Sequence, residues 1–273
     1  MYKDYFRLNE EPFNITPDPR FLYLTDQHRE ALDHLLYGIR HRKGFICLTG
    51  EVGAGKTTLC RTLLARLGPQ VRTALILNPI LTETQLLRAV VAEFAIPTKR
   101  QDRLGYLNLL NAFLLKTSAE GRDAVLIIDE AQNMSVDGLE QVRLLSNLET
   151  ERQKLLQIVL VGQPELRAKL ARPNLRQLAQ RITVRYHLGQ MDQRETQEYL
   201  RHRLEVARGG GIAPVVRFDA GAVHEIFRFS KGTPRLVNAI GDKALLAGYV
   251  HRTGLIDRRL ARLAAAELKE AGR

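Results

Sequence analysis

A phosphate-binding loop is the sequence feature with the clearest chemistry. Residues 50–57 read Gly-Glu-Val-Gly-Ala-Gly-Lys-Thr, a full match to the P-loop pattern, and they lie between an apolar run and a helical run as that motif requires. The glycines let successive backbone N–H groups point at a phosphate, and the start of the helix adds positive potential. We therefore expect a nucleoside triphosphate to be held by consecutive residues, namely Gly50, Glu51, Val52, Gly53, Ala54, Gly55, Lys56, Thr57 and Thr58.

Two adjacent carboxylates supply the other half of a candidate hydrolytic site. Asp129 and Glu130 follow the apolar run 124–128. We expect Lys56 to reach the β- and γ-phosphates, and Mg²⁺ to be bound by Thr57 and Asp129. Glu130 would orient and activate the attacking water, which favours hydrolysis over the phosphoryl transfer of a small-molecule kinase. The alternative is that one of the two acids only caps the next helix.

Four more polar residues are candidates for contacts to the γ-phosphate. Gln163 follows the apolar run 157–161 and would reach the γ-phosphate or the water, although a turn residue is the alternative. Arg176 and Arg181 flank a predicted helix, and either could contact the γ-phosphate of a neighbouring subunit. The position just before the last strand favours Arg181. Arg235 follows Thr233-Pro234 at a predicted helix start and could report the nucleotide state, whereas a plain surface role is the alternative for each arginine.

Alternating strands and helices are expected to position these residues. Five predicted strands, at 45–49, 72–77, 124–128, 157–161 and 182–188, alternate with helical patterns, which predicts an α/β fold with a five-stranded parallel sheet and flanking helices. The run 157–161 fits between two other strands of the sheet, the one that precedes the P-loop and the one that precedes the acidic pair. Beyond Asp192 only helices are expected, near 192–207, 219–229, 233–248 and 256–271, with Gly209–Gly211 as a break.

The expected organisation has three parts. Residues 1–43 form an extended segment and a first helix packed on the ATPase core, residues 44–190 form that core, and residues 191–273 form a small helical lid domain. The first segment is rich in proline and aromatic residues, as in Thr16-Pro17-Asp18-Pro19. Its Phe13 could pack on adenine, although a simple core position is the alternative.

Composition and charge restrict the function further. The chain has 273 residues, 45% hydrophobic and 26% charged, which excludes a disordered or fibrous protein. Only two cysteines, no run of about 18 apolar residues and no signal peptide indicate a cytoplasmic protein without a transmembrane segment. Residues 1–150 are balanced in charge, so residues 151–273 carry the whole excess of +11. That asymmetry favours a polyanion or an acidic partner, or it reflects solvated helix faces.

The order of these motifs resembles the AAA+ ATPases. More narrowly, Glu11-Pro12-Phe13, Gly50-Glu51-Val52-Gly53, Asp129-Glu130-Ala131-Gln132 and Gly162-Gln163-Pro164-Glu165-Leu166 are similar to the ExeA or general secretion pathway protein A family, over about residues 1–250. Gln163 departs from the Asn, Thr or Ser that AAA+ proteins usually carry at the sensor position.

This resemblance implies an ATP- and Mg²⁺-dependent homo-oligomer, a ring or a filament, with the ATP site completed by an adjacent subunit. In the secretion branch such an ATPase helps to assemble a cell-envelope secretion or export machine, joined to a membrane segment and a periplasmic region. This sequence stops at Arg273. It is thus expected to be part of a longer protein or a free-standing relative, associated with the inner membrane through partners or a C-terminal segment. The alternative role is that of the TnsC- and MuB-like transposition regulators, which form filaments on duplex DNA and recruit a transposase.

Overall fold

The computed structural model describes residues 1–14, 18–150, 153–208 and 215–271. Thr16, Pro17 and the break at Gly209–Gly211 therefore lie outside the described residues. The chain divides into two compact units, which are taken separately below. The sheet unit comprises residues 27–50 and 59–188, and the helical unit comprises residues 1–26, 51–58 and 189–273.

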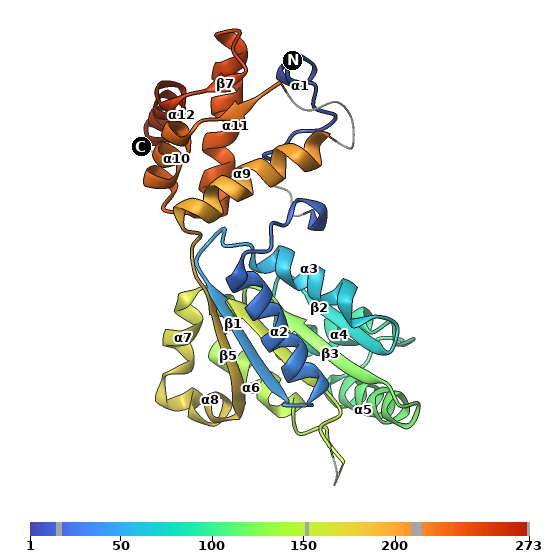
Figure 1. Cartoon of the computed structure of the whole chain (residues 1–273). Coiled ribbons are helices and arrows are strands. Elements are labelled where there is room, and N and C mark those ends of the chain that lie inside the picture. The colour runs from blue at the N-terminus through green and yellow to red at the C-terminus, as the bar shows by residue number, and fades with distance from the viewer. Residues whose placement is uncertain (15–17, 151–152, 209–214, 272–273) are drawn as a thin grey trace. The chain divides into compact units, whose positions relative to one another are not determined.

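The sheet unit is built on five parallel strands, as predicted (Figure 1). Their order is β2-β3-β4-β1-β5. The expectation that the fourth strand along the chain lies between the first and the third is confirmed, because β4 pairs with both β1 and β3. Every residue of β1 and β4 is buried, which explains why these strands are continuous apolar runs. The strands are β1 (Phe45–Gly50), β2 (Val71–Ile76), β3 (Asp123–Ile128), β4 (Gln157–Gly162) and β5 (Ile182–Leu188).

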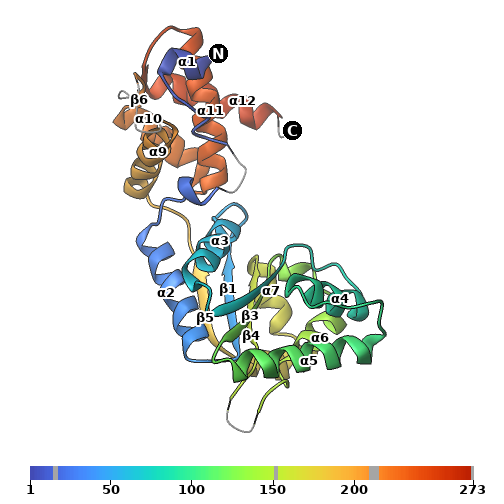
Figure 2. The same cartoon turned by 90° about the vertical axis from the view of Figure 1, so that its right-hand side faces the viewer.

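Helices cover both faces of this sheet. Figure 2 shows α2 and α3 on one side and α4, α5 and α6 on the other. Side-chain oxygens cap several helix starts, since Thr82, Asp102 and Ser135 accept hydrogen bonds from backbone N–H groups in the first turns of α4, α5 and α6. The helices are α2 (Asp26–Arg40), α3 (Lys56–Leu67), α4 (Glu83–Glu93), α5 (Arg103–Ala119), α6 (Val136–Leu145), α7 (Pro164–Leu170) and α8 (Arg176–Arg181), with the 3-10 helices η2 (Ala131–Asn133) and η3 (Pro173–Leu175).

The helical unit contains the four predicted C-terminal helices and a small sheet that the sequence did not indicate. The helices are α9 (Gln193–Arg208), α10 (Ala220–Ser230), α11 (Pro234–Val250) and α12 (Arg258–Ala271). The expectation of helices alone is corrected by β6 (Arg217–Phe218) and β7 (Leu255–Ile256), which pair in parallel. Two residues are too few to produce an alternating pattern, so these strands are invisible to a periodicity argument.

The N-terminal segment packs into the helical unit. It forms α1 (Tyr2–Phe6) and the 3-10 helix η1 (Pro19–Phe21), and Phe6, Leu8, Phe13 and Phe21 join the apolar core of α9–α12. This differs from the expected packing of residues 1–43 on the ATPase core, since only residues from 27 onward belong to the sheet unit. Aromatic side chains predict burial, and they do not indicate which core receives them.

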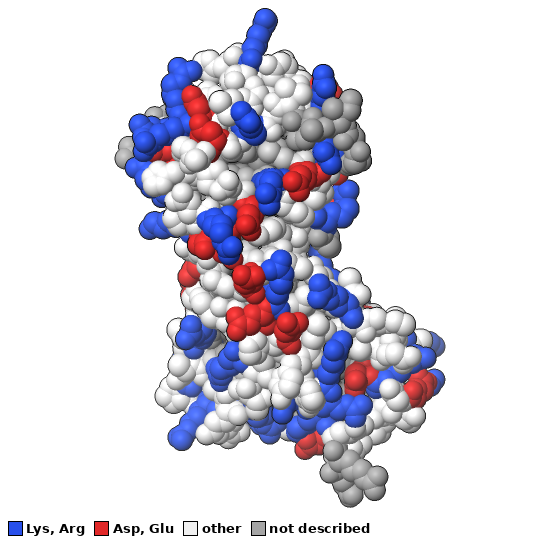
Figure 3. Space-filling view, viewed as in Figure 1, with Lys and Arg blue, Asp and Glu red and all other residues white. Residues whose placement is uncertain are grey.

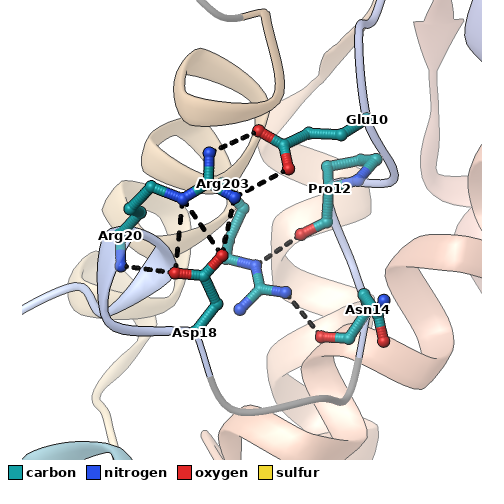
Figure 4. Close-up of polar contacts among 6 residues, drawn as sticks. All are labelled: Glu10, Pro12, Asn14, Asp18, Arg20 and Arg203. Carbon is teal, nitrogen blue, oxygen red and sulfur yellow. Dashed lines mark hydrogen bonds and ion pairs between the residues drawn. The ribbon is translucent and has the colours of Figure 1, made fainter. Parts of the chain in front are cut away.

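Arg203 of α9 fastens this segment in place (Figure 4). Its side chain is only 6% exposed. Nε donates to the carbonyl oxygen of Pro12 at 2.5 Å and Nη2 donates to that of Asn14 at 2.7 Å, while the guanidinium lies 4.6 Å from the ring centroid of Phe21. Arg203 thereby satisfies carbonyl groups of an irregular segment that has few backbone partners of its own.

A second cluster of charges joins α10 to α12. The side chain of Glu225 is fully buried, and it accepts hydrogen bonds from the guanidinium groups of Arg228, Arg258 and Arg262 at 2.6–3.1 Å. The hydrogen bonds from these arginines, Arg262 foremost, lower the pKa of Glu225 from 4.5 to about 2. The arginine side chains themselves are 54–59% exposed, so they remain partly hydrated.

We expect Glu225→Gln to lower the free energy of unfolding by about 1–3 kcal/mol at pH 7, because an amide accepts weaker hydrogen bonds than a carboxylate. A carboxyl group whose pKa is depressed on folding stabilises the fold above its unfolded pKa of 4.5, and this contribution disappears as the pH falls toward about 2. The difference between wild type and variant should therefore shrink between pH 5 and pH 3 in urea titrations.

The matched control is Glu205→Gln, since Glu205 is 58% exposed and lies 3.8 Å from Arg201. Its effect should stay within about 0.5 kcal/mol. Equal stability losses for both variants at pH 7 would contradict a special contribution from Glu225.

On the face drawn in Figure 3, basic and acidic side chains are interspersed over each unit. Cys47 and Cys60 are both buried and free. In the part of the chain that the structure describes, no helix has the length and apolar character needed to cross a bilayer.

Candidate functional site

The candidate site begins at the carboxyl edge of the parallel sheet. Because β3 and β4 run in the same direction, the acidic pair and Gln163 both leave the sheet at this edge. Asp129 follows β3 and is only 2% exposed. Its backbone N–H donates to the carbonyl oxygen of Ile76 on β2 at 2.8 Å, so its position is fixed by the sheet itself.

Glu130 lies in a constrained turn next to Asp129. Its φ is +52°, in the left-handed region that a residue with a side chain rarely adopts. The carboxylate of Asp129 stabilises this turn, since its Oδ1 accepts the backbone N–H of Glu130 at 2.8 Å. The chain then enters η2, which turns the Glu130 side chain toward the end of β4.

Gln163 meets Glu130 in this structure. The Nε2 of Gln163 donates to Oε2 of Glu130 at 3.2 Å, and Nε2 of Gln132 donates to the same oxygen at 2.5 Å. Gln163 therefore contacts Glu130, whereas its expected contact to the γ-phosphate or the water stays a prediction. A carboxylate that accepts two amide hydrogen bonds is oriented, and it still has lone pairs with which to accept a proton from water.

The P-loop itself belongs to the helical unit. Gly53 and Gly55 have φ values of +78° and +92°, which residues with side chains rarely adopt. Lys56, the first residue of α3, is 6% exposed, and its Nζ donates to the carbonyl oxygen of Glu51 at 2.9 Å. This bond folds the lysine across the loop whose backbone N–H groups would surround a phosphate.

Arg235 packs directly against the P-loop. A Cβ atom at Gly53 would lie 2.5 Å from Cβ of Arg235, so only glycine fits here. Arg235 is in the first turn of α11, after Thr233 and Pro234 as predicted. Just before this helix, the carbonyl oxygen of Gly232 accepts a hydrogen bond from the backbone N–H of Met191 at 3.1 Å. The start of α11 is therefore held beside the phosphate-binding loop within one compact unit.

The two candidate arginines of the sheet unit differ in their surroundings. Nη1 of Arg181 donates to Oγ of Ser146 at 2.7 Å and to Oδ1 of Asn147 at 2.6 Å, at the end of α6. Arg176, the first residue of α8, is exposed. Within the described ranges of the chain its side chain makes no hydrogen bond or ion pair.

Phe13 lies in the core of the helical unit. Its ring is 3% exposed, packs edge-on against Phe218 with centroids 5.9 Å apart, and rests on Gly241 of α11. This placement matches the alternative of a simple core residue, and a contact to adenine stays a prediction.

The residues expected to bind Mg²⁺ have suitable chemistry. Magnesium takes oxygen ligands, usually one or two from the protein, together with waters and phosphate oxygens. The hydroxyl of Thr57, in the first turn of α3, and the carboxylate of Asp129, directly after β3, are such ligands. The donor set therefore fits a magnesium–nucleotide complex.

Sequence reasoning did not assign a role to Gln132 or Lys169. Gln132 was visible only as the last residue of the Asp-Glu-Ala-Gln motif. Lys169 of α7 donates from Nζ to the carbonyl oxygens of Gln132 and Met134, at 2.5 and 2.7 Å, and so holds the turn after Glu130. A lysine 37 residues after Gln132 carries no sequence signal for such a contact.

Comparison with known proteins identifies relatives of the chain. Residues 39–170 match a family described as an AAA domain. The chain is 48% identical over 250 residues to General secretion pathway protein A of Aeromonas hydrophila. That alignment covers 91% of this chain and 45% of the relative, so the chain spans less than half of the curated relative's length.

Solved structures share the fold at low sequence identity. The ORC2 protein of Aeropyrum pernix, in its ADPNP–ADP complexes, matches with a TM-score of 0.70 at 18% identity, covering 95% of this chain and 72% of that one. Cdc6p of Pyrobaculum aerophilum matches with a TM-score of 0.66 at 18% identity, covering 90% and 67%. The RuvB branch migration motor of Thermotoga maritima gives 0.54 at 17% identity, covering 89% and 69%.

Proposed function

Because the chain is an AAA+ ATPase of the general secretion pathway protein A (ExeA) family, we propose that it hydrolyses ATP to drive assembly or remodelling of a cell-envelope secretion or export machine. The 48% identity to a protein named for the general secretion pathway, over 91% of this chain, is the observation that carries the choice of pathway. The chain acts from the cytoplasmic side and associates with the inner membrane through its partners or a further segment.

The proposed reaction divides the work among residues of the P-loop and the sheet edge. The P-loop backbone and Lys56 bind the triphosphate, and Thr57 and Asp129 bind the Mg²⁺ that neutralises charge on the phosphates. Glu130 orients the attacking water and accepts its proton, since its carboxylate is fixed by hydrogen bonds. Gln163 assists through its hydrogen bond to Glu130. Arg235, which packs against Gly53, couples the presence of the nucleotide to the position of α11.

The proposal is tested with purified protein, ATP and Mg²⁺. Phosphate release and an ATP-dependent increase in mass by light scattering are the expected results. A protein that neither releases phosphate nor self-associates would overturn the proposed function. The pathway is tested in cells that lack the wild-type protein. A secretion or export phenotype should be restored there by the protein with an intact P-loop and not by a P-loop variant.

Hydrolysis is proposed to take place between subunits of a homo-oligomer, with Arg176 as the residue that reaches the neighbour's γ-phosphate. Its exposed side chain supports this assignment, because Arg181 is engaged with Ser146 and Asn147 of its own chain. The assignment reverses the preference that sequence position gave to Arg181. An arginine supplied from a neighbour contributes roughly 10³–10⁵ to the rate in related phosphoryl transfers.

We expect Arg176→Ala to lower kcat at least about 100-fold, whereas Arg181→Ala keeps kcat within about threefold and loses about 1 kcal/mol of stability. Mixing Arg176→Ala with Glu130→Gln protein should restore activity, because each supplies what the other lacks at a shared interface. The measurement is steady-state phosphate release at varied mixing ratios. Rescue seen for Arg181→Ala and not for Arg176→Ala would contradict the assignment.

A second function is supported by the charge distribution. Residues 151–273 contain 23 Lys and Arg against 12 Asp and Glu, which suits an ATP-dependent filament on duplex DNA that recruits a transposase. Filter binding of duplex DNA with ATP at two salt concentrations discriminates between the functions, because phosphate contacts make affinity fall steeply with salt. Absence of salt-sensitive DNA retention would remove this candidate.

A further inference from the structure

The side-chain amide of Gln132 lies between the ends of β3 and β4, and both its NH₂ group and its oxygen form a hydrogen bond there. Its Nε2 donates to Oε2 of Glu130 at 2.5 Å, and its Oε1 accepts the backbone N–H of Gln163 at 3.0 Å. A carboxylate can only accept and a backbone N–H can only donate, so these two partners fix which end of the amide faces which way. Gln132 therefore ties Glu130, after β3, to the backbone at the end of β4.

Two further contacts keep the Gln132 amide in this place. Gly162 leaves space for it, because a Cβ atom there would lie 2.8 Å from Oε1 of Gln132. Lys169 holds the backbone of the turn through the carbonyl oxygens of Gln132 and Met134. The turn that carries Gln132 is thus anchored to α7, which itself begins directly after Gln163.

The hydrogen bonds to Glu130 fall on one side of its carboxylate. Oε2 accepts from both Gln132 and Gln163. Oε1 accepts no hydrogen bond from residues 1–14, 18–150, 153–208 or 215–271. One oxygen is therefore held and the other retains its lone pairs, which is the arrangement that a general base for water requires.

We propose that Gln132 is a positioning residue for ATP hydrolysis, which fixes one oxygen of the Glu130 carboxylate and leaves the other to bind the attacking water. This inference rests on the role proposed above for Glu130. Gln132 acts through Glu130 and does not contact the nucleotide, so its removal changes the rate of the chemical step and not the binding of ATP. Lys169 of α7 supports the same turn, and its removal should lower the rate less than removal of Gln132.

The test compares two variants that lack the amide, Gln132→Ala and Gln132→Met, of which the second keeps the length of the side chain. We expect kcat to fall about 10- to 100-fold in both, because a carboxylate held by one amide hydrogen bond instead of two is less often aligned with the water. The KM for ATP and the Kd of a fluorescent ATP analogue should stay within about twofold. Gln153→Ala is the matched control, since Gln153 donates to Ser118 in the same unit and is expected to leave kcat unchanged.

A double variant separates positioning from a general structural role. In single-turnover reactions with saturating ATP and Mg²⁺, adding Gln132→Met to Glu130→Gln should cause no further loss, because both changes act on one group. The inference is overturned if kcat is unchanged or rises in both single variants, or if the loss persists in the Glu130→Gln background. Wild-type turnover in Glu130→Gln itself would instead overturn the proposed function.

Discussion

Glu130→Gln is expected to reduce ATP turnover by about 10²–10⁴ while ATP stays bound. The glutamine amide cannot accept a proton from water, but its oxygen can still accept the hydrogen bonds that Gln132 and Gln163 donate to Glu130. Asp129 is unchanged, so magnesium binding should persist. The ATP-bound oligomer should therefore accumulate, and single-turnover phosphate release together with light scattering in ATP measures both effects.

The control for the Glu130 variant is Glu165→Gln, which removes the same charge from an exposed position in the first turn of α7. Its turnover should equal that of wild type. Unchanged turnover in Glu130→Gln would show that another group activates the water, and it would leave nucleotide binding by the P-loop untouched.

Lys56→Ala, in contrast to Glu130→Gln, is expected to weaken nucleotide binding and to raise the Kd for ATP at least about 100-fold. Lys56 is the cation at the start of α3 that lies across the loop and is 6% exposed. Its removal takes away the charge that compensates the triphosphate, and no turnover can follow. The measurement is titration of a fluorescent ATP analogue or calorimetry.

Lys116→Ala is the control for Lys56, because Lys116 is an exposed residue in the last turn of α5. It should bind the nucleotide like wild type. A Kd for Lys56→Ala within about threefold of wild type would mean that the P-loop backbone alone holds the phosphates.

The sheet unit was largely predictable because its central strands are buried on both faces. Such strands appear in a sequence as uninterrupted apolar runs, and β1, β3 and β4 are of this kind. The place of β4 between β1 and β3 was also predicted, because the strand before Gln163 was expected between the strands of the P-loop and the acidic pair. The short β6 and β7 have no comparable signal.

The packing of the N-terminal segment could not be predicted for a different reason. Its attachment depends on Arg203, whose guanidinium donates to the carbonyl oxygens of Pro12 and Asn14. A carbonyl acceptor is present at every residue, so the sequence of the segment does not reveal which arginine will bind it. The apolar residues of the segment predict only that it is buried.

The residues of the candidate site were likewise predictable only in part. The P-loop and the acidic pair are contiguous motifs, so their chemistry is legible in the sequence. The contacts of Gln132 with Gln163 and of Lys169 with the turn after Glu130 join residues more than thirty positions apart, and they depend on side-chain conformations. The difference between Arg176 and Arg181 likewise became visible only through the partners of Arg181 at the end of α6.

The close approach of Gly53 to Arg235 has a consequence for how this protein can diverge. The Cβ of Arg235 fills the space that a methyl group at residue 53 would need. Residue 53 cannot gain a side chain while residue 235 carries a Cβ atom, and the φ of +78° at Gly53 disfavours every residue but glycine even without that contact. Two separate constraints thus hold residue 53 to glycine, whereas the contact depends at residue 235 only on the presence of a Cβ atom.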